Sequence, residues 1–215
     1  MPWLNLDYFA EKLHRSGEKV FFVQVGAMDG VTDDPIHDLV LKYGWRGILV
    51  EPIKDHFETL KRTYAGVEGL AFENAAIAER TGPGTMYRVP TQTVREKKLP
   101  QWALQASSFH LDRSDLGSAE LKPHLVQETV ACLTLPDLLA KHNVKELNVL
   151  QMDTEGYDFP LLGQLDFKKF KPQIINLEIV NMTKQELGQC KRLLDVQGYL
   201  YTKIGYDLLA VSLPV

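Results

Sequence analysis

The stretch VFFVQVGAMDGV, residues 20–31, is an apolar run that changes within a few residues into two glycines and an aspartate. The residues from Val20 to Val25 are typical of a buried strand, and Gly26, Asp29 and Gly30 follow. A glycine directly after a first strand lets the backbone turn sharply and approach a ligand with no Cβ in the way. The stretch therefore predicts a strand that ends in a ligand-binding loop.

Helix and strand patterns alternate around this stretch. Apolar residues at helical spacing predict helices over 6–13, 34–43, 55–66, 135–143 and 183–198, and apolar runs predict strands over 20–25, 47–50, 70–79, 129–133, 146–153 and 171–180. Residues 199–205 and 206–213 predict an antiparallel hairpin at one edge. Because parallel strands need crossover connections, this order predicts an α/β fold with a mostly parallel sheet and helices on both faces.

The composition favours one globular domain. The 215 residues have 45% hydrophobic content, so we expect a single domain over 1–215, with an N-terminal helix within 1–19. Residues 91–127 are polar and too long for an idle connection, which predicts a lid or substrate-binding insertion. This segment is called the insertion below.

Charge and cysteine content argue against several classes of partner. The net charge is −4, so no basic surface for nucleic acid is expected. The two cysteines, Cys132 and Cys190, form no CxxC pattern and suggest reduced thiols. No apolar run approaches the roughly 20 residues of a membrane span, and the N-terminus lacks the pattern of a signal peptide. We expect a cytoplasmic protein without a membrane span; the sequence gives no indication of its oligomeric state.

The strand ends predict a nucleoside ligand without phosphates. Gly26 and Gly30 form G-x-x-x-G rather than the dinucleotide fingerprint G-x-G-x-x-G, and their loop has no lysine for a phosphate. Glu51 ends the second strand, where a carboxylate can accept hydrogen bonds from two ribose hydroxyls. The glycine spacing also argues against a nicotinamide reductase.

Five motifs occur in an order that resembles the FkbM family of S-adenosylmethionine-dependent methyltransferases. They are VQVGAMDG, ILVEP, FENAAIAE, VLQMDTEGYD and IINLEI, and the resemblance covers roughly Val20 to Asn181. The resemblance implies a class I, Rossmann-like fold with seven strands, the last one antiparallel. It also implies transfer of a methyl group to a hydroxyl oxygen of a small acceptor, such as a sugar or secondary metabolite.

The resemblance also implies a cofactor site. The loop from Gly26 to Gly30, which contains Ala27 and Asp29, would lie under the methionine end of S-adenosylmethionine, and Glu51-Pro52 would lie at the ribose. Asn74 and Ala75 would border the adenine, and Asp153 would lie beside the sulfonium. Many related enzymes have an acid where this chain has Gln24, so its contact to the methionine amino group is expected to be weaker or to run through water.

Methyl transfer to an alcohol needs a group that takes a proton. Asp153 ends the fourth strand of the predicted site, and Glu155 lies two residues later, close enough for one carboxylate to raise the pKa of the other. Glu155 could equally cap the following helix. His110, within the insertion, is the alternative base.

Other chemistries stay open on the sequence. Asp153, Glu178 and Asn181 present oxygen atoms at adjacent strand ends and could hold a divalent metal, although a metal is not expected. Transfer to nitrogen or to a carboxyl group is not excluded by any residue. A cofactor-binding protein without catalytic activity is a further alternative, which would predict a damaged loop or missing acids.

Overall fold

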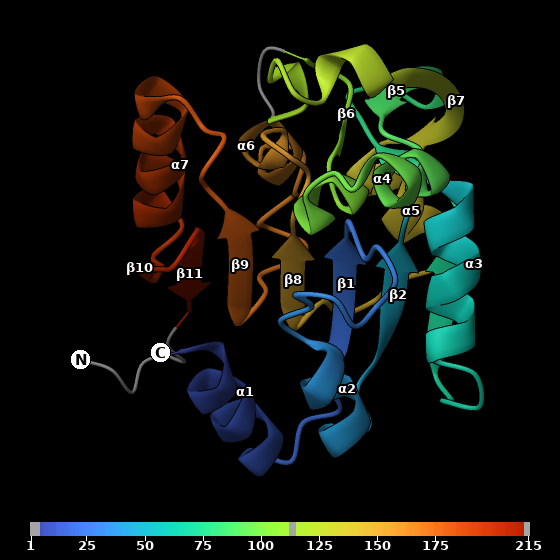
Figure 1. The fold of residues 1–215 in the computed structure, drawn as a ribbon. Helices are drawn as coiled ribbons and strands as arrows, with labels where there is room; N and C mark the ends of the chain where they lie inside the picture. The colour runs from blue at the N-terminus through green and yellow to red at the C-terminus, as the bar shows by residue number, and fades with distance from the viewer. Residues whose placement is uncertain (1–4, 112–114, 213–215) are drawn as a thin grey trace.

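The main sheet contains seven strands in the order β10-β11-β9-β8-β1-β2-β3 (Figure 1). The structure is a computed structural model and describes residues 5–111 and 115–212. The strands of this sheet are β1 (Phe21–Val25), β2 (Arg46–Val50), β3 (Leu70–Glu73), β8 (Val149–Met152), β9 (Ile174–Glu178), β10 (Leu200–Ile204) and β11 (Asp207–Val211). Only β11 runs antiparallel to its neighbours, β9 and β10. The predicted mostly parallel sheet with a closing hairpin is confirmed.

Side chains of alternating strand positions fill two cores, one on each face of the main sheet. Phe22 lies in the core covered by α1 (Leu6–Arg15), α2 (His37–Tyr43) and α3 (Lys54–Thr63). Its neighbour Val23 lies in the opposite core, which α5 (Leu135–Lys141), α6 (Asp158–Leu162) and α7 (Lys184–Val196) cover. This alternation follows from the two-residue period of a strand and gives the predicted helices on both faces.

A second, four-stranded sheet lies beyond the carboxyl ends of the parallel strands (Figure 1). Its order is β4-β7-β5-β6, formed by β4 (Ala76–Ile77), β7 (Val126–Leu133), β5 (Gly82–Arg88) and β6 (Ser107–Ser108). The predicted strand over 70–79 is therefore two strands in two different sheets. The strand pattern missed β5 because Gly82, Pro83 and Gly84 interrupt it.

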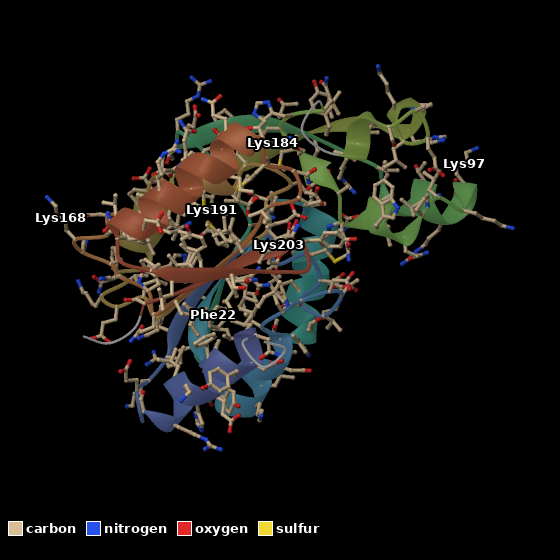
Figure 2. All side chains as sticks on the ribbon, turned by 90° about the vertical axis from the view of Figure 1, so that its left-hand side faces the viewer. Phe22, Lys97, Lys168, Lys184, Lys191 and Lys203 are labelled. Atoms are coloured by element: carbon tan, nitrogen blue, oxygen red, sulfur yellow. The ribbon has the colours of Figure 1, made fainter. Side chains whose placement is uncertain are left out.

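The insertion contains short helices around a small core of its own. They are α4 (Thr91–Lys97) and the 3₁₀ helices η1 (Gln101–Leu104), η2 (Asp115–Gly117) and η3 (Lys122–His124). Val94, Ala103 and Leu116 are buried in this core. Figure 2 shows the insertion projecting to one side of the main sheet, with Lys97 near its outer end. None of the helices within the described ranges is long and apolar enough to cross a membrane.

The predicted helix over 34–43 begins later than the sequence pattern indicated. Helix α2 starts at His37, and the Asp34 carboxylate accepts hydrogen bonds from the backbone N–H groups of Ile36 and His37 at 2.9 and 3.0 Å. Asp34 therefore belongs to the loop after β1, and its carboxylate stabilises the start of the helix.

Candidate active site at the carboxyl ends of the strands

A pocket of about 150 Å³ lies where the carboxyl ends of β1, β2 and β8 meet the second sheet. Most of the residues predicted for cofactor binding line it: Gln24, Gly26, Ala27, Glu51, Pro52, Ala75 and Asp153. Glu155 and Glu178 line the same pocket. Parallel strands bring these residues together because their carboxyl ends meet at one edge of the sheet.

Position 26 requires a glycine because the end of β8 lies directly against it. Its φ is +81°, and a Cβ at this position would lie far inside van der Waals contact with the backbone oxygen of Asp153. The absence of a side chain at Gly26 thus lets the end of β1 approach the end of β8. The sequence suggested close approach to a ligand, whereas the contact in the structure is between two protein backbones.

Glu51 connects the glycine loop to the start of α3. Its carboxylate accepts hydrogen bonds from the backbone N–H of Met28 at 2.9 Å and of Ile53 at 2.8 Å. The residue is 4% exposed, and burial raises the pKa of Glu51 to about 7 against the lowering effect of these two hydrogen bonds. Each oxygen keeps a further lone pair, so the carboxylate can still accept a hydroxyl donor.

Gln24 is 2% exposed and turns its side chain toward the loop before α2. Its Nε2 donates to Oδ2 of Asp34 at 3.0 Å. Its Oε1 is buried and has no hydrogen-bond partner among the described residues. Asp34 also lines the pocket and was not predicted from the sequence. The run Asp33-Asp34, shortly after the glycine loop, is the pattern that could have indicated it.

Three residues predicted for cofactor binding lie outside the pocket lining. Asp29 accepts hydrogen bonds from Val31 and Thr32 and closes a turn. Gly30 packs against Leu60 and Tyr64, where a Cβ would clash with both side chains. The Asn74 amide donates to the backbone oxygens of Glu51 and Pro52 at 2.8 and 3.0 Å, so it positions the end of β2.

Carboxylates gather at the ends of β8 and β9. Asp153 is exposed toward the pocket, but the protein around it, followed by the charge of Asp207, raises the pKa of its carboxyl. Burial and then the charge of Asp153 raise the pKa of Glu178. Asp158, in α6, is fully buried, and burial followed by the charge of Asp153 raises its pKa to about 8. Because these acids repel one another's negative charge, their ionised forms are disfavoured together.

The residues considered for a metal are connected by an amide. Asn181 donates through Nδ2 to Glu155 at 3.1 Å and to Glu178 at 3.4 Å, so it presents a donor rather than an oxygen ligand to these carboxylates. Within the described ranges, no group of three or more His, Cys, Asp or Glu residues is arranged to hold a metal ion.

The insertion and second sheet form the outer wall of the pocket. Met86, Gln105, Ser107 and Phe109 line it from this side. His110 lies outside the lining, but its ring stacks on Tyr157 with 5.8 Å between ring centroids, and Tyr157 lines the pocket. The alternative base is thus one aromatic ring removed from the pocket. Trp102, also in the insertion, does not line the pocket, and its side chain is 40% exposed.

When the seven strands of the main sheet are numbered by their order in the chain, their order across the sheet is 3-2-1-4-5-7-6. The pocket lies at the switch in this strand order. These two features define a Rossmann-like α/β protein of the class I methyltransferase type. A family model described as the methyltransferase FkbM domain matches residues 24–203. The chain belongs to this family, as the sequence motifs predicted.

Solved structures agree on the fold. The crystal structure of methyltransferase FkbM from Methylobacillus flagellatus KT is 14% identical to this chain, with a TM-score of 0.54 over 90% of this chain and 43% of that one. The N-terminal domain of human METTL16 is 14% identical, with a TM-score of 0.51 over 99% of this chain and 70% of that one. No curated protein matches the sequence. The chain thus spans less than half of the FkbM structure it resembles.

Proposed function

We propose that the chain binds S-adenosylmethionine in the pocket and transfers its methyl group to a hydroxyl oxygen of a sugar or another small metabolite. The carrying observation is the meeting of Glu51, Gly26 and Asp153 in one pocket at the strand ends of a chain of the FkbM methyltransferase family. Two acceptors fit a ligand that combines an amine with a ribose. Oε1 of Gln24 is buried without a partner among the described residues, and the carboxylate of Glu51 can still accept hydrogen bonds from hydroxyl groups.

The residues that would hold the cofactor lie on three strand ends. Glu51 would accept hydrogen bonds from the ribose hydroxyls, Ala75 would border the adenine, and the loop at Gly26 and Ala27 would lie beneath the methionine end. When bound, S-adenosylmethionine supplies a methyl group made electrophilic by a sulfonium sulfur.

Asp153 is the proposed general base. Its raised pKa lets the carboxylate take the proton of an acceptor hydroxyl at near-neutral pH, and its charge in turn raises the pKa of Glu178. Phe109 and Tyr157, whose ring centroids lie 6.5 Å apart, would pack against the acceptor and exclude water.

The test is calorimetric titration with S-adenosylmethionine and, separately, with NADH, followed by methyl transfer from radiolabelled cofactor to sugar, amine and carboxylate acceptors. We expect binding of the sulfonium cofactor alone and label on the hydroxyl acceptors. Label on amines or carboxylates would overturn the choice of oxygen, and binding without any transfer would favour the non-catalytic alternative.

Asp153→Asn separates the base from the binding site. We expect turnover to fall by about two to four orders of magnitude, the usual contribution of a general base, with cofactor affinity within a few-fold of the parent. His110→Gln is the matched control and should keep turnover. The opposite pattern, with His110→Gln inactive and Asp153→Asn active, would move the base to the insertion.

A further inference from the structure

The end of β1 carries an amide where a charge is expected for a ligand amine. Gln24 is neutral, and its Oε1 is a buried acceptor that no described residue satisfies. A buried acceptor without a partner is destabilising, so a ligand donor at this atom would bind favourably. The amide of Gln24 donates a hydrogen bond to the carboxylate of Asp34, in the loop before α2.

The Asp34 carboxylate is held in place by three donors. Oδ1 accepts from the backbone N–H groups of Ile36 and His37, and Oδ2 accepts from Nε2 of Gln24. This last bond also fixes the amide of Gln24, because a flipped amide would turn Oε1 toward the carboxylate. Asp34 thereby orients Oε1 as the remaining acceptor.

The negative charge of Asp34 lacks a basic ion-pair partner within the described residues. None of the ion pairs among the described residues includes Asp34, and the neighbouring basic group whose charge acts on its carboxyl is His37. Burial raises the pKa of this carboxyl, so its ionised form would gain from a nearby cation. Asp33, next in the chain, already accepts from Gln105 at 2.8 Å.

We propose that Asp34 and Gln24 together bind the ammonium group at the amino-acid end of the cofactor, with Asp34 supplying the charge and Gln24 the second acceptor. An ammonium group has three N–H donors, which suits one carboxylate oxygen and one amide oxygen that belong to two residues lining the same pocket. The inference rests on the proposed function and adds a residue, Asp34, to the cofactor site.

The experiment compares two thioethers without a sulfonium charge, S-adenosylhomocysteine and 5′-methylthioadenosine. Only the first carries the amino-acid tail with its ammonium group. Their dissociation constants are measured by calorimetry for the parent, for Asp34→Asn and for the charge swap Gln24→Glu with Asp34→Asn. Asp38→Asn, an exposed acid in the first turn of α2, is the matched control. Unfolding temperatures report on the capping role of Asp34.

We expect Asp34→Asn to raise the dissociation constant of S-adenosylhomocysteine by roughly 10- to 100-fold, as for loss of a charge-assisted hydrogen bond. The dissociation constant of 5′-methylthioadenosine should stay within a few-fold of the parent value. The swap should recover most of the loss, and Asp38→Asn should change neither affinity.

Two results would overturn the inference while keeping the proposed function. Equal weakening of both thioethers by Asp34→Asn would make Asp34 a structural cap, and equal affinity of the parent for both would make the amino-acid tail irrelevant. If the parent bound neither thioether nor S-adenosylmethionine, the proposed function itself would fail, and this inference with it.

Discussion

Gly26 and Gly17 have nearly the same backbone conformation, with φ values of +81° and +82°, but different surroundings. A Cβ at Gly17 has no atom within 4 Å, whereas one at Gly26 collides with the Asp153 backbone. We expect Gly17→Ala to cost about 1–2 kcal/mol through backbone strain alone. Gly26→Ala should cost several times more or prevent folding, because neither strand end can move without breaking the sheet.

Thermal unfolding of the two alanine variants measures this difference. Soluble yield serves as a second readout where Gly26→Ala does not fold. Equal melting temperatures for the two variants would mean that the end of β8 moves away freely, and the close approach of β1 and β8 would then be unimportant for the pocket.

Glu51 has a structural role in addition to the proposed contact with ribose. Glu51→Ala removes the acceptor of two backbone N–H groups, which should cost about 1–3 kcal/mol for each group left unpaired. Glu51→Gln keeps one acceptor oxygen and should lie between parent and alanine variant in unfolding temperature. Both variants should weaken S-adenosylhomocysteine in calorimetry. An alanine variant that unfolds at the parent temperature would contradict the anchoring role of Glu51.

At the scale of elements, two polar contacts hold the outer wall of the pocket against the main sheet. Arg88, at the end of β5, donates to Glu128 in β7 and to Asp55 in α3, the latter at 3.3 Å. Gln105 donates to Asp33 in the loop after β1. The second sheet and the insertion are therefore attached to α3 and to the loop after β1.

Arg88→Met should loosen this attachment. We expect faster amide hydrogen exchange in β5 and β7, unchanged exchange in β1, and faster release of S-adenosylhomocysteine, because the wall no longer holds its place over the pocket. Arg95→Met, an exposed change on α4, is the control. Unaltered exchange in Arg88→Met would show that the hydrophobic packing alone holds the second sheet.

The elements that the sequence predicted best are those buried on both faces. Strands β1, β2, β8 and β9 consist mainly of apolar residues, so their pattern indicated a parallel sheet without knowledge of their partners. Strand β4 has two residues and β5 begins with Gly82-Pro83-Gly84, so both depend on pairing with β7, whose paired residues lie 38 to 56 positions further along the chain. Such pairing leaves little local pattern.

The candidate site follows the same division. The strand-end residues Glu51 and Asp153 were predicted because strand order alone brings them together. The partnership of Gln24 with Asp34 was missed, since it depends on how the loop folds back over β1.

At the scale of the whole molecule, burial raises the pKa of several acids in the folded state. Burial raises the pKa of Glu51 to about 7 and that of Asp158 to about 8, and it raises the pKa of Glu178 as well. In the unfolded chain these groups ionise near pH 4. Above that pH the folded state binds more protons than the unfolded state, so stability falls as pH rises through the folded pKa values.

On the acid side, the effect of His56 opposes that of the buried acids. Burial lowers its pKa below 6.5, so the unfolded chain gains a proton first as pH falls, and stability is lost on that side. Between pH 6.5 and 9 the buried acids therefore dominate. We expect the unfolding temperature to fall by roughly 5–10 °C across this range, the size of a change of a few kcal/mol in a domain of this length.

Asp158→Asn tests which group carries the slope. The amide cannot ionise, so the unfolding temperature of the variant should fall less between pH 6.5 and 9 than that of the parent. This comparison holds even if the two proteins unfold at different temperatures at pH 6.5. Cys190→Ser, a change of a buried thiol in α7, is a control that lowers stability without removing an acid. A parent-like slope in Asp158→Asn would mean that Asp158 is ionised throughout the range, and the pH dependence would then belong to Glu51 and Glu178.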